Sequence, residues 1–318
     1  MFAATFFDGE GWRDGVLGIE DGRPVLRDAW ATPGMRRLDG VLVGGFTDHH
    51  VHLQLVDHTL LAASSLGRVV DLGADPRVLS ELRSSLDDQG VAIEFAGAFL
   101  TSVGGYPTDR DWAPVDSFRE VADATAAEAA VGEMADAGAS CIKVASNRTA
   151  GPVFDDALFG VIVENAHARG LPVVAHAEGR GEAQRVARLG ADRLAHAPFT
   201  ERLTDDEIAA QAASVSWIST LAIHGGADLR IALDNVRRFH AAGGTVLYGT
   251  DMGNGPTPVG VNGQEIAALR DAGITGAALL RALAPQKPLD PASVLLRLPG
   301  TDADPTLARA LTGADLKA

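Results

Sequence analysis

Strand-like and helix-like runs alternate from about residue 41 to residue 285, and this alternation constrains the fold more than any other feature of the chain. It is typical of a parallel sheet, because consecutive parallel strands need a crossover between them. Eight apolar runs have strand character: 41–47, 69–73, 91–98, 141–145, 172–176, 192–196, 215–220 and 245–250. Helices are predicted between them at 76–88, 118–137, 155–169, 180–189, 204–213 and 227–241.

Eight strand–helix units predict an α/β fold, a closed (β/α)₈ TIM barrel, which needs about 250 residues. Several predicted helices end at a glycine just before the next strand, as helix C-termini commonly do. A doubly wound open sheet is the alternative. It is less favoured because no Gly-x-Gly-x-x-Gly turn follows the first strand, and because eight units are present.

The two ends of the chain predict a second, smaller unit. Asp-Gly pairs recur between short apolar runs before residue 42, and they favour β-hairpins, with strands at 15–20 and 24–26 joined by Asp21-Gly22. A further apolar run at 292–298 is predicted to be a strand that rejoins these hairpins. We therefore expect a small β-sandwich made of residues 1–42 and the C-terminal segment 286–318, with the barrel at 43–285.

Composition limits the partners and the compartment of this protein. The net charge of −15 disfavours nucleic acid and membrane surfaces, and the single cysteine excludes an intrachain disulfide or a Cys-rich metal site. No run is long and apolar enough to span a bilayer, and the N-terminus lacks the basic start and apolar stretch of a secretion signal. These features predict a cytoplasmic protein. They leave the oligomeric state open, a homo-oligomer included.

Polar side chains stand where five of the predicted strands end, which is where barrel enzymes carry their chemistry. Alternate residues share one face of a strand, so His50 and His52 point the same way, about 6.5–7 Å apart, whereas His49 points away. Taken singly, such residues also occur as hydrogen-bonded core histidines, a turn-capping aspartate or a snorkelling lysine. Together they are hard to bury without a metal ion, because buried charges must be paired or coordinated. The set is His50, His52, Lys143, His176, His196 and Asp251.

With these residues, the chain resembles the amidohydrolase superfamily of metal-dependent hydrolases over about residues 41–285. The shared pattern is His-x-His after strand one, Lys after strand four, His after strands five and six, and Asp after strand eight. Five shorter stretches resemble the branch that contains imidazolonepropionase and the Xaa-Pro or Xaa-Arg dipeptidases: Cys141-Ile142-Lys143-Val144, Ala175-His176-Ala177-Glu178-Gly179, Ser219-Thr220-Leu221, Tyr248-Gly249-Thr250-Asp251-Met252-Gly253 and Asp271-Ala272-Gly273-Ile274.

The resemblance implies two divalent metal ions, zinc by expectation, held by these side chains. His50, His52 and Asp251 would bind one ion and His176 and His196 the other, with Lys143 bridging both as a carbamate formed from CO₂. An ammonium group would repel a metal ion, whereas a carbamate supplies an anionic oxygen ligand. The implied reaction is attack on a carbonyl by a hydroxide held between the ions, with Asp251 moving the proton to the leaving nitrogen. Asp251 and Lys143 are therefore the expected catalytic residues.

The chain departs from its family in one place that bears on the substrate. The branch carries Gly-Gly-His after strand three, where the histidine meets the reacting carbonyl, and this chain has Gly104-Gly105-Tyr106. Tyr106 is therefore a candidate for that contact, unless the substrate differs. His224, after strand seven, and Arg148, after strand four, are further candidates for substrate binding. The compact loops and the short C-terminal part weaken a dipeptidase interpretation.

These observations predict a binuclear metal-dependent hydrolase that cleaves the C–N bond of an amide or cyclic amide in a small molecule. A lactonase or esterase using the same site is an alternative that the ligands do not distinguish. A mononuclear deaminase is less favoured, since the deaminases of this superfamily lack the bridging lysine. A non-catalytic binding barrel would be indicated by lost ligands, and none is lost.

Overall fold

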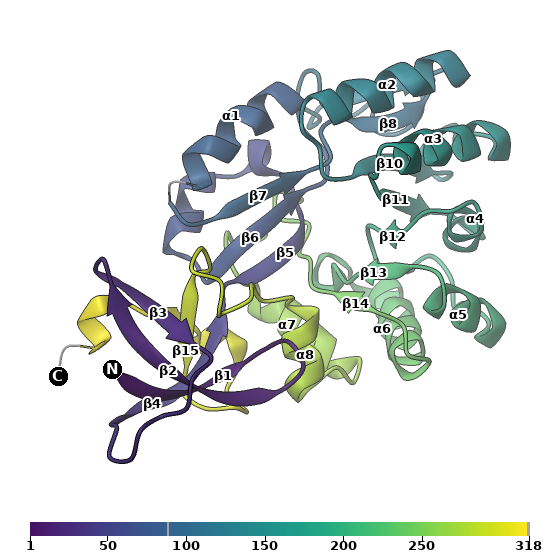
Figure 1. Cartoon of the computed structure of the whole chain (residues 1–318). Helices are drawn as coiled ribbons and strands as arrows, with labels where there is room; N and C mark the ends of the chain where they lie inside the picture. The colour runs from purple at the N-terminus through teal and green to yellow at the C-terminus, as the bar shows by residue number, and fades with distance from the viewer. Residues whose placement is uncertain (88, 317–318) are drawn as a thin grey trace.

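The computed structural model describes residues 1–87 and 89–316 and shows two kinds of sheet (Figure 1). The N-terminal strands form one six-stranded sheet with two strands from the C-terminal segment, in the order β16-β15-β4-β1-β2-β3. The strands are β1 (Phe2–Phe7), β2 (Trp12–Glu20), β3 (Arg23–Arg27), β4 (Arg37–Gly44), β15 (Leu295–Leu298) and β16 (Arg309–Ala310). No helix in the described ranges combines the length and apolar character needed to cross a bilayer.

The predicted hairpin and the predicted return of the C-terminal segment are both confirmed. β2 pairs with β3 up to Glu20 opposite Arg23, and the turn residues Asp21 and Gly22 have φ of 48° and 79°, as a two-residue hairpin turn requires. β15 runs antiparallel to β4. The expected β-sandwich is instead a single continuous sheet that packs around its own small core, which includes Phe6 and Leu42.

The segment 41–47, predicted as one strand, divides between two sheets. β4 ends at Gly44 in the small sheet, and β5 (Phe46–Val51) begins the parallel strands. A Cβ atom on Gly44 would lie 1.9 Å from the carbonyl oxygen of Gln286, and one on Gly45 would lie 2.7 Å from Cα of Gly67. The change of sheet therefore needs two glycines, because the backbone of Gln286 passes directly against Gly44 and the backbone of Gly67 directly against Gly45.

The parallel strands curl around a common centre, with the helices on their outer side (Figure 1). One group is β5-β6-β7, where β6 is Leu66–Asp71 and β7 is Ala92–Phe95. The other, in the order β14-β13-β12-β11-β10-β8-β9, comprises β8 (Phe99–Ser102), β9 (Phe118–Val121), β10 (Ile142–Asn147), β11 (Val173–Glu178), β12 (Arg193–Leu194), β13 (Ser216–Ile218) and β14 (Val246–Leu247).

Hydrogen bonds connect the two groups of parallel strands at both ends. Ser140, just before β10, donates its N–H to the carbonyl of Phe95 in β7 at 2.8 Å. On the other side, His49 of β5 donates to the carbonyl of Tyr248 at 3.0 Å, and Val51 forms a parallel bridge with Met252. The carboxyl ends of β5 and of the segment after β14 are thereby neighbours, although about 200 residues separate them in the sequence.

The helices follow the strands as the alternation predicted. They are α1 (Pro76–Asp87), α2 (Ala124–Asp136), α3 (Asp156–Ala168), α4 (Glu182–Arg188), α5 (Asp205–Ala212), α6 (Gly226–Ala241), α7 (Gly263–Asp271) and α8 (Gly276–Ala282). Asp88, the last residue of the predicted helix 76–88, lies outside the described residues. The predicted helix 118–137 is wrong in its first turns. Residues 118–121 pair with β8 as β9, and the helix begins only where the Asp123 side chain accepts the N–H of Ala126.

Candidate active site

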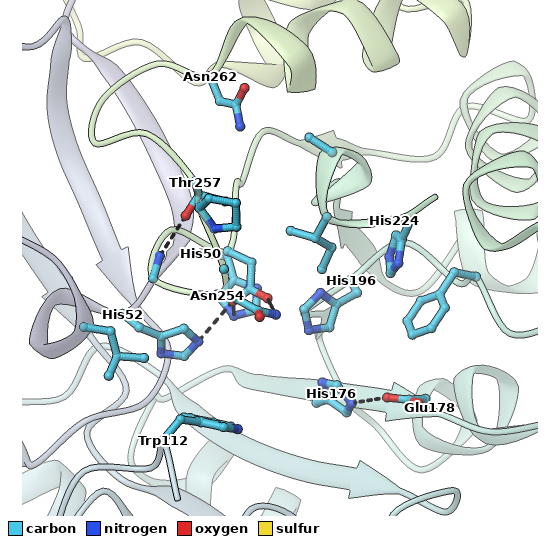
Figure 2. Close-up of a pocket in the computed structure, with 18 of the residues that line it drawn as sticks. His50, His52, Trp112, His176, Glu178, His196, His224, Asn254, Thr257 and Asn262 are labelled. Atoms are coloured by element: carbon cyan, nitrogen blue, oxygen red, sulfur yellow. Dashed lines mark hydrogen bonds and ion pairs between the residues drawn. The ribbon is translucent and has the colours of Figure 1, made fainter. Parts of the chain in front are cut away.

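A cavity of about 620 Å³ lies beside the carboxyl ends of the parallel strands (Figure 2). Its walls come from the ends of β5, β8, β10 and β11, from the segments after β12 and β14, and from the turns that follow them. This volume is in the range of small-molecule sites. The six predicted ligands come from five strands or strand ends, and all six line this cavity: His50, His52, Lys143, His176, His196 and Asp251.

His50, His52 and Asp251 form a compact, buried group. The Nε2 atoms of His50 and His52 each lie 3.2 Å from Oδ1 of Asp251. On the far side of each ring, Nδ1 donates to a backbone carbonyl: His50 to Ala195 at 2.8 Å and His52 to Gly73 at 3.1 Å. These contacts fix both rings in the tautomer that leaves Nε2 free, which is the usual arrangement of a metal-binding histidine.

The donor set of this group fits a divalent cation. Two imidazole nitrogens and one carboxylate oxygen converge, and their ligand atoms all lie within 4.8 Å of one another. Burial and the nearby Lys143 hold the pKa of His50 well below its usual value, so that ring is neutral. Burial lowers the pKa of His52 too, but the hydrogen bond and charge of Asp251 outweigh it and raise the pKa overall. A positive charge between these atoms is therefore favourable, whether proton or metal ion.

Asp251 is held in place from several directions. Its φ of 54° is unusual for a residue other than glycine. Its Oδ2 atom accepts a hydrogen bond from the Asn254 side chain at 2.8 Å. Beneath it, the Asp48 carboxylate accepts the Thr250 hydroxyl at 2.6 Å and the His50 N–H at 3.0 Å, which connects β5 to the residue before Asp251. Burial raises the pKa of Asp251, but His50 and His52 outweigh it, so the net pKa is well below the usual value.

The other three predicted ligands lie beside this group. The ring of His196 is centred 4.8 Å from that of His50 and 4.8 Å from that of His176. His196 Nδ1 lies 2.9 Å from the Thr220 hydroxyl, so its Nε2 is the nitrogen left to bind an ion. Lys143 is only 1% exposed on β10, and burial lowers the pKa of its amine to about 8. A buried amine near its pKa has a substantial neutral fraction, which is the form that reacts with CO₂.

His176 has its hydrogen-bond partner on Nε2, whereas His50, His52 and His196 each make a hydrogen bond through Nδ1. The His176 Nε2 atom lies 3.1 Å from Oε2 of Glu178, two residues farther along β11 (Figure 2). Glu178 is itself held by the Asn147 amide at 2.7 Å and the Thr149 hydroxyl at 2.9 Å. The hydrogen bond from His176 is the main cause that lowers the pKa of Glu178, so the carboxylate stays ionised. Nδ1 of His176 is then the nitrogen left for an ion.

Glu178 was not among the predicted site residues, although it belongs to the stretch Ala175-His176-Ala177-Glu178-Gly179 that resembles the dipeptidase branch. A carboxylate two residues after a histidine on the same strand shares its face, and this spacing is the signal that could have identified it. Asn254 was missed as well, because it lies in an irregular turn whose conformation no periodicity predicts. Three aromatic side chains of the cavity, Phe99, Trp112 and Phe199, were also not selected.

Two of the three predicted substrate contacts line the cavity. The Tyr106 ring stacks on His176 with centroids 5.3 Å apart, and burial raises the pKa of its hydroxyl, which therefore keeps its proton. His224 lies against Phe199, with ring centroids 4.1 Å apart, and its Nε2 is buried with no hydrogen-bond partner among the residues that the structure describes. An unpartnered nitrogen at a cavity wall is available to a ligand.

Arg148 and His49 lie elsewhere. Arg148 is not part of the cavity lining, and its guanidinium pairs with the buried carboxylate of Glu182, with Nε 2.6 Å from Oε1. We therefore do not carry it forward as a substrate contact. His49 is buried outside the cavity lining, as its position on β5 predicted. Burial, followed by the charge of Arg193, lowers its pKa to about 3, so it is neutral.

The whole chain is similar to solved enzymes. A Xaa-Pro dipeptidase with methionine bound in its active site matches with a TM-score of 0.74 and 16% identity over 98% of both chains. The ochratoxinase of A. niger matches with a TM-score of 0.71 and 16% identity, over 98% of this chain and 95% of that chain. An amidohydrolase matches with a TM-score of 0.70 and 16% identity, over 98% and 96%. No family model and no curated protein sequence matches the chain.

This similarity confirms the predicted resemblance at the level of the fold. The matched proteins include an amidohydrolase and a Xaa-Pro dipeptidase, which are the group and the branch that the sequence motifs indicated.

Proposed function

We propose that this protein is a metal-dependent hydrolase of the amidohydrolase superfamily that cleaves a C–N bond, amide or cyclic amide, in a small molecule. We also propose that the parallel strands, β5 to β14, close into a (β/α)₈ barrel. The hydrogen bonds from β5 to both β6 and the segment around β14 support this closure. The observation that carries the function is the convergence of six buried donors at one end of these strands, at the edge of a 620 Å³ cavity.

The donors divide naturally into two metal sites. His50 Nε2, His52 Nε2 and Asp251 Oδ1 would hold one ion, and His196 Nε2 and His176 Nδ1 the other. Lys143 would join the two as its carbamate. Nitrogen and oxygen donors of this kind suit zinc. When bound, the ions supply Lewis acidity toward a carbonyl and lower the pKa of water toward ~7.

The protein's own residues would orient the substrate and move the proton. The Asp251 carboxylate lies at the centre of the group and can accept a proton from the attacking water and deliver it to the leaving nitrogen. The Tyr106 hydroxyl lines the cavity in protonated form and can donate a hydrogen bond to the substrate carbonyl oxygen. His224, with its unpartnered Nε2, can bind a polar group on the leaving side.

The test combines metal content with activity. Wild-type protein and the Lys143→Ala variant are loaded with zinc, with and without added bicarbonate, and then assayed against a panel of amides, cyclic amides and lactones. We expect about two equivalents of zinc in the wild type, fewer in the variant, and hydrolysis of amides that disappears in Asp251→Asn. One equivalent that is insensitive to Lys143 would contradict the binuclear site. Hydrolysis of lactones alone would contradict the C–N specificity, and no bound metal would contradict the catalytic proposal.

A further inference from the structure

Aromatic side chains are concentrated around the cavity. Four of its 24 lining residues are Phe, Tyr or Trp, whereas these types make up 5% of the chain. They do not lie at random positions on the wall. Phe99 is stacked beside His52, Tyr106 beside His176, and Phe199 lies edge-on to His196, with ring centroids 5.7, 5.3 and 6.4 Å apart. The imidazoles that would bind metal are therefore bordered by aromatic rings on more than one side.

Three of these rings form one continuous wall. Trp112 contacts Phe99 edge-on, with centroids 6.5 Å apart, and Tyr106 at 6.0 Å. Phe99 is at the start of β8, whereas Tyr106 and Trp112 come from the turns after it. We call Phe99, Tyr106 and Trp112 the aromatic wall. Figure 2 draws Trp112 below His52 in its view of the cavity.

Contacts within the protein hold the aromatic wall in place. The Tyr106 carbonyl accepts the Thr101 hydroxyl at 2.7 Å, and the Arg110 guanidinium lies over the Tyr106 ring at 5.7 Å. Phe99 is 3% exposed, whereas Trp112, which also lines the cavity, is 40% exposed. A large apolar ring that is supported on its buried side and open toward a cavity gains contact area when a flat group covers it.

We propose that the aromatic wall binds a flat apolar group, an aryl ring, next to the amide that is cleaved. This inference rests on the proposed hydrolase function and assigns its substrate class: aryl amides in preference to amides of small aliphatic amines or acids. The wall adjoins His52 and His176, which belong to the two candidate metal sites. An aryl group on the wall would thus place an adjoining carbonyl near both sites.

The test compares substrates that differ only in the aryl group. Acetanilide and N-methylbenzamide carry the ring on the nitrogen and on the acyl side, and N-methylacetamide carries none. In Trp112→Ala we expect KM to rise about fivefold to tenfold for at least one aryl substrate and to change less than twofold for N-methylacetamide. Trp112→Phe should restore most of the difference. Trp30→Ala, which removes a tryptophan that is 94% exposed in the segment between β3 and β4, is the matched control.

The outcomes separate this inference from the function on which it rests. Equal changes in KM for aryl and aliphatic substrates, or no change in either, would overturn the aromatic wall as a subsite while leaving the hydrolase intact. If the wild type cleaves none of the amides and cyclic amides used to test the proposed function, the C–N hydrolase proposal fails, and binding alone then tests the aryl subsite. Saturation-transfer NMR should then show contact between the aryl protons of acetanilide and the wild type, and little contact with Trp112→Ala. Equal contact with both proteins would refute the aromatic wall as the site of the aryl group.

Discussion

Glu178→Gln should weaken the metal site that contains His176 and His196 and leave the site of His50, His52 and Asp251 nearly unchanged. Glu178 accepts from His176 Nε2 at 3.1 Å, and this contact determines which ring nitrogen faces the other ligands. A carboxylate is the stronger acceptor, and its charge increases the basicity of the imidazole toward a metal ion. The amide of glutamine keeps the size of the side chain but loses that charge, so the ring is held less firmly.

The expected size of this effect follows from the burial of the pair. The His176 side chain is 11% exposed, so water cannot easily replace the lost partner. Loss of such an outer contact typically costs 10-fold to 100-fold in metal affinity, which corresponds to about 1.4–2.7 kcal/mol. The Asn147 and Thr149 side chains would still hold the substituted amide in part, so we expect the lower half of this range.

The assay is zinc affinity measured by competition with a chromophoric chelator, with the absorption spectrum of the cobalt-substituted protein as a second readout. We expect the second equivalent of zinc to bind about tenfold more weakly in Glu178→Gln, with the first unchanged. Glu201→Gln is the matched control, because its side chain is also 26% exposed and it lies outside the cavity lining. Unchanged affinity for both equivalents would refute the role of Glu178, and so would the same loss in Glu201→Gln.

Three further predictions concern other parts of the molecule. Tyr106→Phe keeps the stacking on His176 but removes the hydroxyl, so kcat for amide hydrolysis should fall about 100-fold with zinc content unchanged; an unaltered kcat would exclude the hydroxyl as the carbonyl donor. Trp217→Ala should lower the free energy of unfolding, measured in urea, by about 3–5 kcal/mol, because Trp217 is fully buried and stacks on Phe239 with ring centroids 3.8 Å apart. A loss below about 1 kcal/mol would contradict this packing. Burial raises the pKa of Glu265 from 4.5 to about 7. Between these pH values the folded state therefore binds more protons than the unfolded state, and the free energy of unfolding falls by roughly 3 kcal/mol as pH rises through this range. Glu265→Gln should abolish that part of the decline in urea titrations from pH 5 to pH 8, and identical slopes would refute it.

The positions of the candidate ligands were predictable because they depend on a simple regularity. Parallel strands bring their carboxyl ends to one edge, so a polar residue at each strand end is placed near the others whatever the loops do. His176 and His196 illustrate this point: 20 residues separate them in the sequence, and their rings lie 4.8 Å apart. The strands themselves were predicted too long at 192–196, 215–220 and 245–250, yet their order and direction were sufficient to place the ligands.

Features that depend on close contact between distant segments were not predictable. Residues 41–47 read as one continuous apolar strand, and nothing in their own pattern shows that the chain changes sheet at Gly45. The cause is Gln286, whose N–H donates to the Gly45 carbonyl at 2.8 Å from the far end of the chain. Similarly, the start of the predicted helix 118–137 pairs with β8, a tertiary contact that overrides local helix propensity.

Arg148 shows how the same limit affects functional assignments. An arginine after a strand end is a reasonable candidate for binding a substrate carboxylate when only the local sequence is considered. In the structure, α4 places Glu182 beneath it with a side chain only 1% exposed, and a carboxylate so buried must be neutralised and hydrogen-bonded. Arg148, Arg185 and the Ser146 hydroxyl supply those contacts. A buried carboxylate therefore pairs with a nearby arginine, and that arginine is then not available to bind a substrate. Which arginines can bind substrate depends on the acidic side chains that the fold buries beside them.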